Sequence, residues 1–199
     1  MNQDWPQGEP PRRQKGFTTL VTQAAGRKHL DARWTLCPAG GVDKVWAFVS
    51  LFGGNNLHVA ALVDYATGHK SNIEKLRRSG LLKAGHVLLA TEFCGKDEAD
   101  IEDLFGEELF LTIVNKAYGI PVTSALKLET LPAGPGLGQR VVQRVEAAMR
   151  LVPDVPEFDH FLQSSWVVQN PSAIKMSEHP AALDNFEKLF DTINKLLPR

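Results

Sequence analysis

Leu57-His58-Val59-Ala60-Ala61-Leu62-Val63-Asp64 is the stretch that decides the fold class. It is apolar on both faces, as expected of a central parallel strand that helices cover on both sides, and it ends on an acid. A second apolar stretch at residues 86–90 predicts another strand. Residues 70–79, between the two, have the pattern of a charged amphipathic helix that Gly80 ends. This order of strand, helix and strand indicates a βαβ unit with a parallel sheet.

The residues before this unit predict a further strand and helix. Residues 33–37 are expected to form a short strand that runs into the turn Pro38-Ala39-Gly40-Gly41. A helix that stops at Gly53-Gly54 follows, because apolar side chains recur at helical spacing at Val45, Phe48, Val49 and Phe52. We therefore expect an α/β sheet over about residues 32–92.

The second half of the chain has a helical pattern. Helices are expected over residues 100–105, 107–118, 139–150 and 180–197, with a Pro/Gly-rich linker at 132–136. The division that we predict is a disordered or weakly helical leader at 1–28, an α/β domain at 29–120 and a helical C-terminal extension at 121–199.

Composition limits the classes of function. The 199 residues include 22 basic and 23 acidic side chains, so a DNA contact would have to come from a local patch. The two cysteines, Cys37 and Cys94, have no partners at metal-ligand spacing, and we expect buried, reduced thiols rather than a zinc site or a disulfide. The sequence has neither a secretory signal pattern nor a long apolar run, which leads us to expect a cytoplasmic protein without a membrane contact.

Two acidic features follow the predicted strands, where sites form in open α/β sheets. The first is Asp64, and the second is Glu98-Ala99-Asp100-Ile101-Glu102-Asp103-Leu104-Phe105. In this second stretch the apolar side chains are expected to share the buried face of a helix. Asp100, Glu102 and Asp103 are then expected to point away from that face. Each feature also has an ordinary explanation, since Asp64 could cap the next turn and acids in a first helical turn favour the helix dipole.

Together the acids favour a magnesium or manganese site, because hard divalent ions take oxygen ligands from carboxylates on different elements. Basic residues offer weaker signals. Lys44, at a helix start, could meet a phosphate or remain solvated. Two predicted helices have basic faces that could hold a DNA backbone or simply face solvent. Their basic residues are Lys70, Lys75, Arg77 and Arg78 in one helix and Arg140, Arg144 and Arg150 in the other.

A family resemblance rests on four stretches taken together. They are Pro38-Ala39-Gly40-Gly41-Val42-Asp43-Lys44, the strand that ends at Asp64, the acidic stretch 98–105, and Phe186-Glu187-Lys188-Leu189-Phe190-Asp191-Thr192-Ile193-Asn194. Over about residues 25–197, their order and spacing resemble the TOPRIM domain of OLD-family ATP-dependent endonucleases. The resemblance implies a TOPRIM-like, Rossmann-like parallel sheet flanked by helices. It also implies metal ligands at Asp64, Glu102 and Asp103, with Asp100 as an addition, and a basic residue at Lys175 near the scissile phosphate.

The sequence departs from this family in three places. It lacks the Glu-Gly-x-Ser-Asp type motif that supplies the first glutamate, it has Asp64-Tyr65-Ala66 where Asp-x-Asp is expected, and it has no ATPase phosphate loop. The resemblance implies a DNA endonuclease module that uses Mg²⁺ or Mn²⁺ and has no ATP site of its own. A separate ATPase subunit could complete it, and the chain could also form a homo-oligomer. The alternative is a catalytically inactive remnant that acts as a DNA-binding or protein-interaction subunit.

Overall fold

The computed structural model describes residues 26–37, 39, 42–53, 57–133 and 138–198. It is an α/β structure in which helices surround a small parallel sheet of two strands, so the predicted class is confirmed at this level. Most of the predicted leader and most of the Pro/Gly-rich linker lie outside the described residues.

The sheet consists of β1 (Ala61–Val63) and β2 (Val87–Leu89), which pair in parallel with Leu62 opposite Leu88. Both strands are shorter than the apolar stretches that predict them. Successive side chains of a strand point to opposite faces. Accordingly, the first and third residues of each strand join one apolar cluster, whereas Leu88 belongs to a second cluster and Leu62 packs against it. Apolar residues therefore cover the sheet on both faces, as the sequence predicts.

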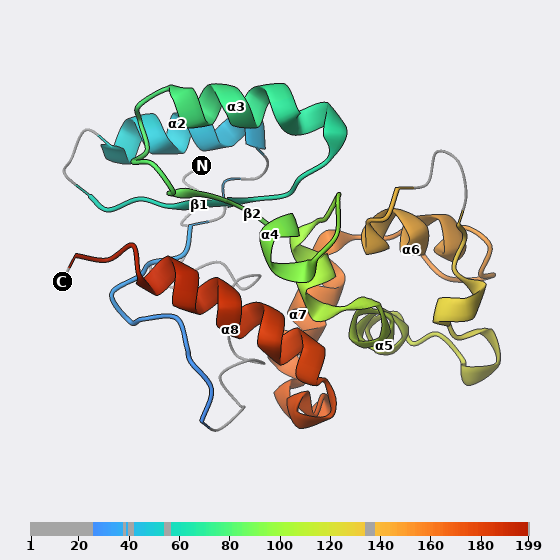
Figure 1. Cartoon of the computed structure of the whole chain (residues 1–199). Coiled ribbons are helices and arrows are strands. Elements are labelled where there is room, and N and C mark those ends of the chain that lie inside the picture. The colour runs from blue at the N-terminus through green and yellow to red at the C-terminus, as the bar shows by residue number, and fades with distance from the viewer. Residues whose placement is uncertain (1–25, 38, 40–41, 54–56, 134–137, 199) are drawn as a thin grey trace, which may run out of the picture.

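Helices α2 (Val42–Gly53) and α3 (Lys70–Arg78) cover one face of the sheet, where Figure 1 shows them side by side. Val45 and Val49 of α2 and Ile73 and Leu76 of α3 share the smaller cluster with the strands. The i, i+4 and i, i+3 spacings of these pairs put each pair on a single helix face.

The larger cluster lies on the other side of the sheet. It contains residues from both the predicted α/β domain (29–120) and the predicted C-terminal extension (121–199). Among the described helices, none combines the length and apolar character that a membrane crossing needs. The α-helices that contribute to the larger cluster are α4 (Thr91–Cys94), α5 (Glu107–Ala117), α6 (Val141–Met149), α7 (His160–Gln169) and α8 (Pro180–Asn194). The short 3₁₀ helices are η1 (Thr67–His69), η2 (Ile101–Phe105), η3 (Val122–Ser124), η4 (Leu128–Thr130), η5 (Pro171–Ala173) and η6 (Met176–Glu178).

The strand that we predict at residues 33–37 is wrong, because this segment has no strand pairing. The residues just before it are attached to α8 instead. Arg27 Nη1 lies 2.7 Å from Glu187 Oε2, and the backbone N–H of Asp31 donates to Asn194 Oδ1 at 2.9 Å. Cys37 lies in this unpaired segment and is exposed rather than buried, which corrects the expectation for that thiol.

Cys94 is partly buried at the end of α4, and its Sγ donates to the carbonyl oxygen of Ala90 at 3.4 Å. Both cysteines are free, in agreement with the expectation of reduced thiols. Burial raises the pKa of the Cys94 thiol, so the reactive thiolate form is disfavoured.

Candidate functional site

The end of β1 is joined to the start of η2 by backbone pairing. Tyr65 and Ala99 exchange two N–H to carbonyl hydrogen bonds, of 2.8 and 2.9 Å, in an isolated antiparallel bridge. The bridge places Asp64 beside the first turn of η2, where the backbone N–H of Ile101 donates to Asp64 Oδ1 at 2.9 Å. The two acidic features that the sequence singles out are therefore neighbours in space.

A capping box orients the acids of η2. The Asp103 side chain accepts from the backbone N–H of Asp100 at 2.8 Å, and the Asp100 side chain accepts from the backbone N–H of Asp103. Reciprocal bonds of this kind satisfy donors that the first turn of a helix leaves without partners. Between these residues Glu102 is only 5% exposed. The sequence thus buries carboxylates that an ordinary exposed helix start would leave in water.

Asp64, Asp100 and Glu102 form what we call the acidic cluster. Burial, together with the charges of Glu102 and Asp100, raises the pKa of Asp64 from 3.8 to about 6. Burial also raises the pKa of Asp100, although Arg140 opposes that shift. Carboxylates that are buried close together destabilise one another's charged forms unless a cation is present. The cluster therefore has the electrostatic character of a cation site.

Arg140 forms an ion pair with one carboxylate of the acidic cluster. Its Nη1 lies 2.9 Å from Asp100 Oδ1, and its side chain is 19% exposed. Arg140 occupies the N-cap position of α6. The sequence does place this arginine on a basic helix face. It does not predict the pairing, because Arg140 is 40 positions away from Asp100.

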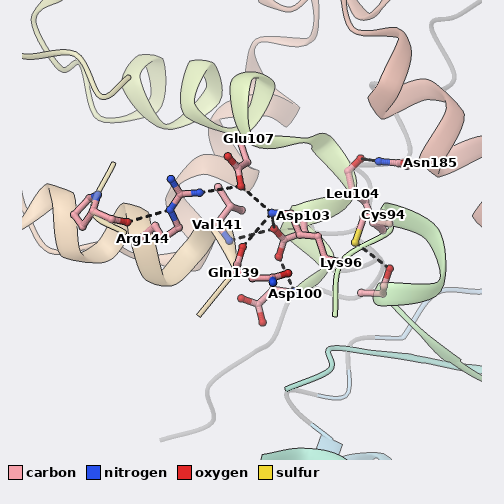
Figure 2. A network of polar contacts seen from close by, with 12 residues as sticks. Cys94, Lys96, Asp100, Asp103, Leu104, Glu107, Gln139, Val141, Arg144 and Asn185 are labelled. Atoms are coloured by element: carbon pink, nitrogen blue, oxygen red, sulfur yellow. Dashed lines mark hydrogen bonds and ion pairs between the residues drawn. The ribbon is translucent and has the colours of Figure 1, made fainter. Parts of the chain in front are cut away.

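Asp103 lies at the centre of a separate polar network (Figure 2). Its Oδ1 accepts from Lys96 Nζ at 2.7 Å and from the backbone N–H of Val141 at 3.1 Å. Lys96 also reaches Glu107 at 2.9 Å, and Arg144 meets the same carboxylate at 2.9 Å. These donors, with the N–H of Asp100, engage both oxygens of Asp103. Lys96 gives no signal in the sequence, because the residue lies alone in a loop.

His160 approaches the cluster from α7. Its Nδ1 lies 3.4 Å from Glu102 Oε1, and its Nε2 lies 4.0 Å from Glu146 Oε1 on α6. A contact between residues 58 positions apart leaves no signal in a sequence whose histidines show no recognisable pairing. The ring is therefore a neighbour of the site that the sequence analysis missed.

The remaining predicted site residues lie on exposed surfaces. Lys44 on α2 and Lys70 on α3 are exposed, and Lys175 is 76% exposed with its Nζ 3.7 Å from Glu178. Within the described part of the chain, no hydrogen bond or ion pair joins Lys44 or Lys175 to the acidic cluster. Arg77 Nη2 lies 3.2 Å from both the carbonyl of Val87 and Glu92, and Arg78 pairs with Glu74 at 3.8 Å.

The ligands available to a metal ion are few. Across residues 26–37, 39, 42–53, 57–133 and 138–198, no group of three or more His, Cys, Asp or Glu is arranged to hold one. In the acidic cluster Asp100 is paired with Arg140, Asp64 accepts from the backbone N–H of Ile101, and Glu102 lies 3.4 Å from His160. Mg²⁺ is commonly held by one or two carboxylates and several waters, so a magnesium site here would have to be built on Asp64 and Glu102 with water as the other ligands.

Comparison with family models, curated proteins and solved structures finds no match for the chain.

Proposed function

We propose that the chain is a Mg²⁺- or Mn²⁺-dependent DNA endonuclease module of the TOPRIM type. The observation that supports this proposal best is the acidic cluster, in which a strand-end aspartate and a buried glutamate of the next acidic turn lie together. Sites of open α/β sheets form at this end of the strands, and hard divalent ions bind carboxylates there. The TOPRIM-like, Rossmann-like form of the sheet is part of the same proposal.

In this proposal Asp64 and Glu102 hold the ion. A bound ion of this kind polarises a phosphoryl oxygen and lowers the pKa of a coordinated water. A bound cation would stabilise the charged form of Asp64, whose pKa is raised to about 6 by burial and by its acidic neighbours. Asp103 positions η2, since its oxygens already accept from Lys96, Val141 and Asp100.

DNA is the proposed substrate, and the exposed basic side chains are its proposed contacts. Lys44 and Lys175 would neutralise phosphate charge, and α3 would meet the backbone through Lys70, Arg77 and Arg78. A separate ATPase subunit that supplies the missing first glutamate is the proposed setting for full activity, and a homo-oligomer is a further proposed partner arrangement.

The second candidate is a catalytically inactive subunit that binds DNA or another protein. One observation favours it: two acids of the expected metal set are already neutralised inside the molecule. Asp100 pairs with Arg140 at 2.9 Å, and Asp103 pairs with Lys96 at 2.7 Å. An acid that has a fixed basic partner needs no metal ion to be stable in the fold.

Plasmid nicking by the purified chain tests the first candidate. The parent chain is incubated with Mg²⁺, with Mn²⁺ and with EDTA, beside Asp64→Asn and Glu102→Gln. Glu129→Gln, which changes an exposed carboxylate on η4, serves as the matched control. We expect metal-dependent nicking by the parent and the control and its loss in the other two variants. Nicking that survives in both variants contradicts the proposed site, and no nicking by the folded parent favours the inactive subunit.

A further inference from the structure

An open cavity of about 400 Å³ lies at the edge of the sheet where the two strands begin. One wall comes from residues 57–59, just before β1, and the other comes from the segment 80–86, which joins α3 to β2. The acidic cluster follows the opposite ends of the strands and shares no residue with this cavity. The volume is within the range of small-molecule sites, about 300–1,000 Å³.

His86 is the enclosed polar residue of the cavity. The residue is only 6% exposed, and its Nδ1 lies 2.7 Å from the carbonyl oxygen of Val59. A carbonyl oxygen can only accept, so Nδ1 carries the hydrogen of this bond and donates it. Nε2 has no hydrogen-bond partner among the described residues. The protein therefore orients the ring through one nitrogen and leaves the other for a ligand.

The backbone around His86 is fixed as well. Its N–H donates to the carbonyl oxygen of Lys83 at 3.0 Å, which closes a four-residue turn. Gly85 in this turn has a φ of 81°, a conformation that favours glycine. The carbonyl oxygen of His86 accepts from the N–H of Ala61 in β1 at 2.8 Å. A ring that is held in this way loses little freedom when a ligand binds.

The ionisable side chains of the cavity are basic. Lys83 and His58 line it together with His86, and no Asp or Glu of the described ranges does so. An ammonium group and the Nε2–H of a protonated imidazole are both strong donors to a carboxylate. The polar part of the lining is therefore suited to an anion.

The apolar part of the lining is incompletely covered by protein. Leu57 is 56% exposed and Leu81 is 37% exposed, and both line the cavity beside Val59 and the buried Leu82. An apolar group placed there would take the surface of these side chains out of water. The lining thus combines donors for a negative charge with a wall for an apolar body.

We infer that this cavity binds a small organic anion with an apolar body. Its carboxylate, or an equivalent acidic group, would meet Nε2 of His86 and the ammonium group of Lys83, and its body would lie against Leu57 and Leu81. The inference goes beyond the proposed function and does not depend on it, because the two sites lie at opposite ends of the strands.

Octanoate is the probe for this site, titrated into the purified full chain by calorimetry and by NMR of the histidine rings. Octanol supplies the apolar body without the charge, and inorganic phosphate supplies charge without the body. Octanoate is expected to bind at least about tenfold more tightly than either, a difference of about 1.4 kcal/mol. The ¹⁵N signals of the His86 ring are expected to move when octanoate is added.

Two variants test the assigned donors. His86→Asn keeps an N–H donor near the place of Nδ1 and has no atom in the place of Nε2, whereas Lys83→Met keeps the length of the side chain and removes its charge. Each is expected to bind octanoate at least about fivefold more weakly than the parent. The matched controls, His29→Asn and Lys175→Met, change exposed residues elsewhere and are expected to bind like the parent.

Urea denaturation establishes which variants are folded. If His86→Asn does not fold, Lys83→Met and the ring signals of the parent decide the question. Weaker binding by the folded cavity variants, with binding by the controls unchanged, upholds the inference. No octanoate binding by the folded parent, equal binding of octanol or of inorganic phosphate, or unchanged binding by the folded cavity variants overturns it.

Discussion

Lys96 Nζ lies 2.7 Å from Oδ1 of Asp103, whose side chain is completely buried. The same ammonium group reaches Glu107 at 2.9 Å and the carbonyl of Gln139 at 3.1 Å. The loop after α4, the helix η2, the start of α5 and the residue before Arg140 are therefore tied to one charged group (Figure 2). This network supports the acidic cluster, because Glu102 lies on the turn that Asp103 holds in place.

Removing the acid of the buried Lys96–Asp103 pair should destabilise the protein. Asp103→Ala leaves a partly buried ammonium short of a partner and takes an acceptor from two backbone N–H groups. We expect the free energy of unfolding to fall by about 3–5 kcal/mol, the range for breaking a buried ion pair from one side. Urea denaturation measures it. Lys175→Ala, which removes an exposed lysine, should change stability by less than about 0.5 kcal/mol, and a similarly small effect of Asp103→Ala would contradict the role of the pair.

Asp64 should give the stability of the protein a recognisable pH dependence. Burial and the nearby Glu102 and Asp100 raise its pKa from 3.8 to about 6, so the folded state binds the proton more tightly than the unfolded chain. This contribution is fully present below the unfolded pKa of about 4 and is lost as the pH rises through about 6. At about 1.4 kcal/mol per pKa unit, it amounts to about 2–3 kcal/mol.

The comparison that isolates this effect is the difference in unfolding free energy between the parent and Asp64→Asn, measured at intervals from about pH 4 to pH 7. The advantage of the parent should shrink across that window, because asparagine does not titrate. Glu129→Gln should follow the parent at every pH. A parent-to-Asp64→Asn difference that is constant with pH would show that the pKa of Asp64 is not raised.

Gln163 offers a change that should stabilise the protein. It is 1% exposed, and neither Oε1 nor Nε2 of its amide has a hydrogen-bond partner among the described residues. A buried polar group without a partner costs about 1–3 kcal/mol. Gln163→Met keeps the length and removes both polar atoms, so we expect a gain of about 1 kcal/mol in thermal or urea unfolding. A loss of stability would instead indicate that bound water satisfies the amide.

Arg77 and Arg78 should differ in what they do, although they are adjacent. Arg77 connects α3 to the carbonyl of Val87 and to Glu92, whereas Arg78 is 82% exposed and meets only Glu74 at 3.8 Å among its described partners. If α3 binds a DNA backbone, the slope of the log binding constant against log salt concentration should become shallower in Arg78→Ala, by about 0.9 for each lost phosphate contact. The stability of this variant should not change. Arg77→Ala should make the salt dependence shallower and should also lower the free energy of unfolding. Fluorescence anisotropy across a salt series, with parallel urea curves, gives both values.

The sequence predicts helices well where apolar residues recur on one face and poorly where they do not. Helix α8 is predicted from its apolar stripe, and the structure confirms it. Helix α7 has no such pattern, because Phe161 and Leu162 are exposed while the polar Gln163 and Ser164 are buried. The burial pattern of α7 depends on tertiary packing that no local pattern records.

The candidate site also has a part that the sequence predicts and a part that it does not. The approach of Asp64 to the acids of η2 follows from a general rule about the ends of parallel strands, so the sequence predicts it. The partners of those acids do not follow from any such rule, since Arg140 and His160 come from helices 40 and 58 positions away from the acids they meet. Residues 33–37 show the opposite error, because the local pattern predicts a strand that has no pairing in the structure, while the residues just before them contact α8.

The attachment of the early residues to α8 has a consequence for biosynthesis. Arg27 and Asp31 emerge from the ribosome long before their partners on residues 184–194 exist. The same late helix supplies Phe186, Leu189 and Phe190 to the larger apolar cluster. Until α8 has been made, that cluster stays exposed, and the nascent chain is a candidate client for chaperones that shield apolar surface.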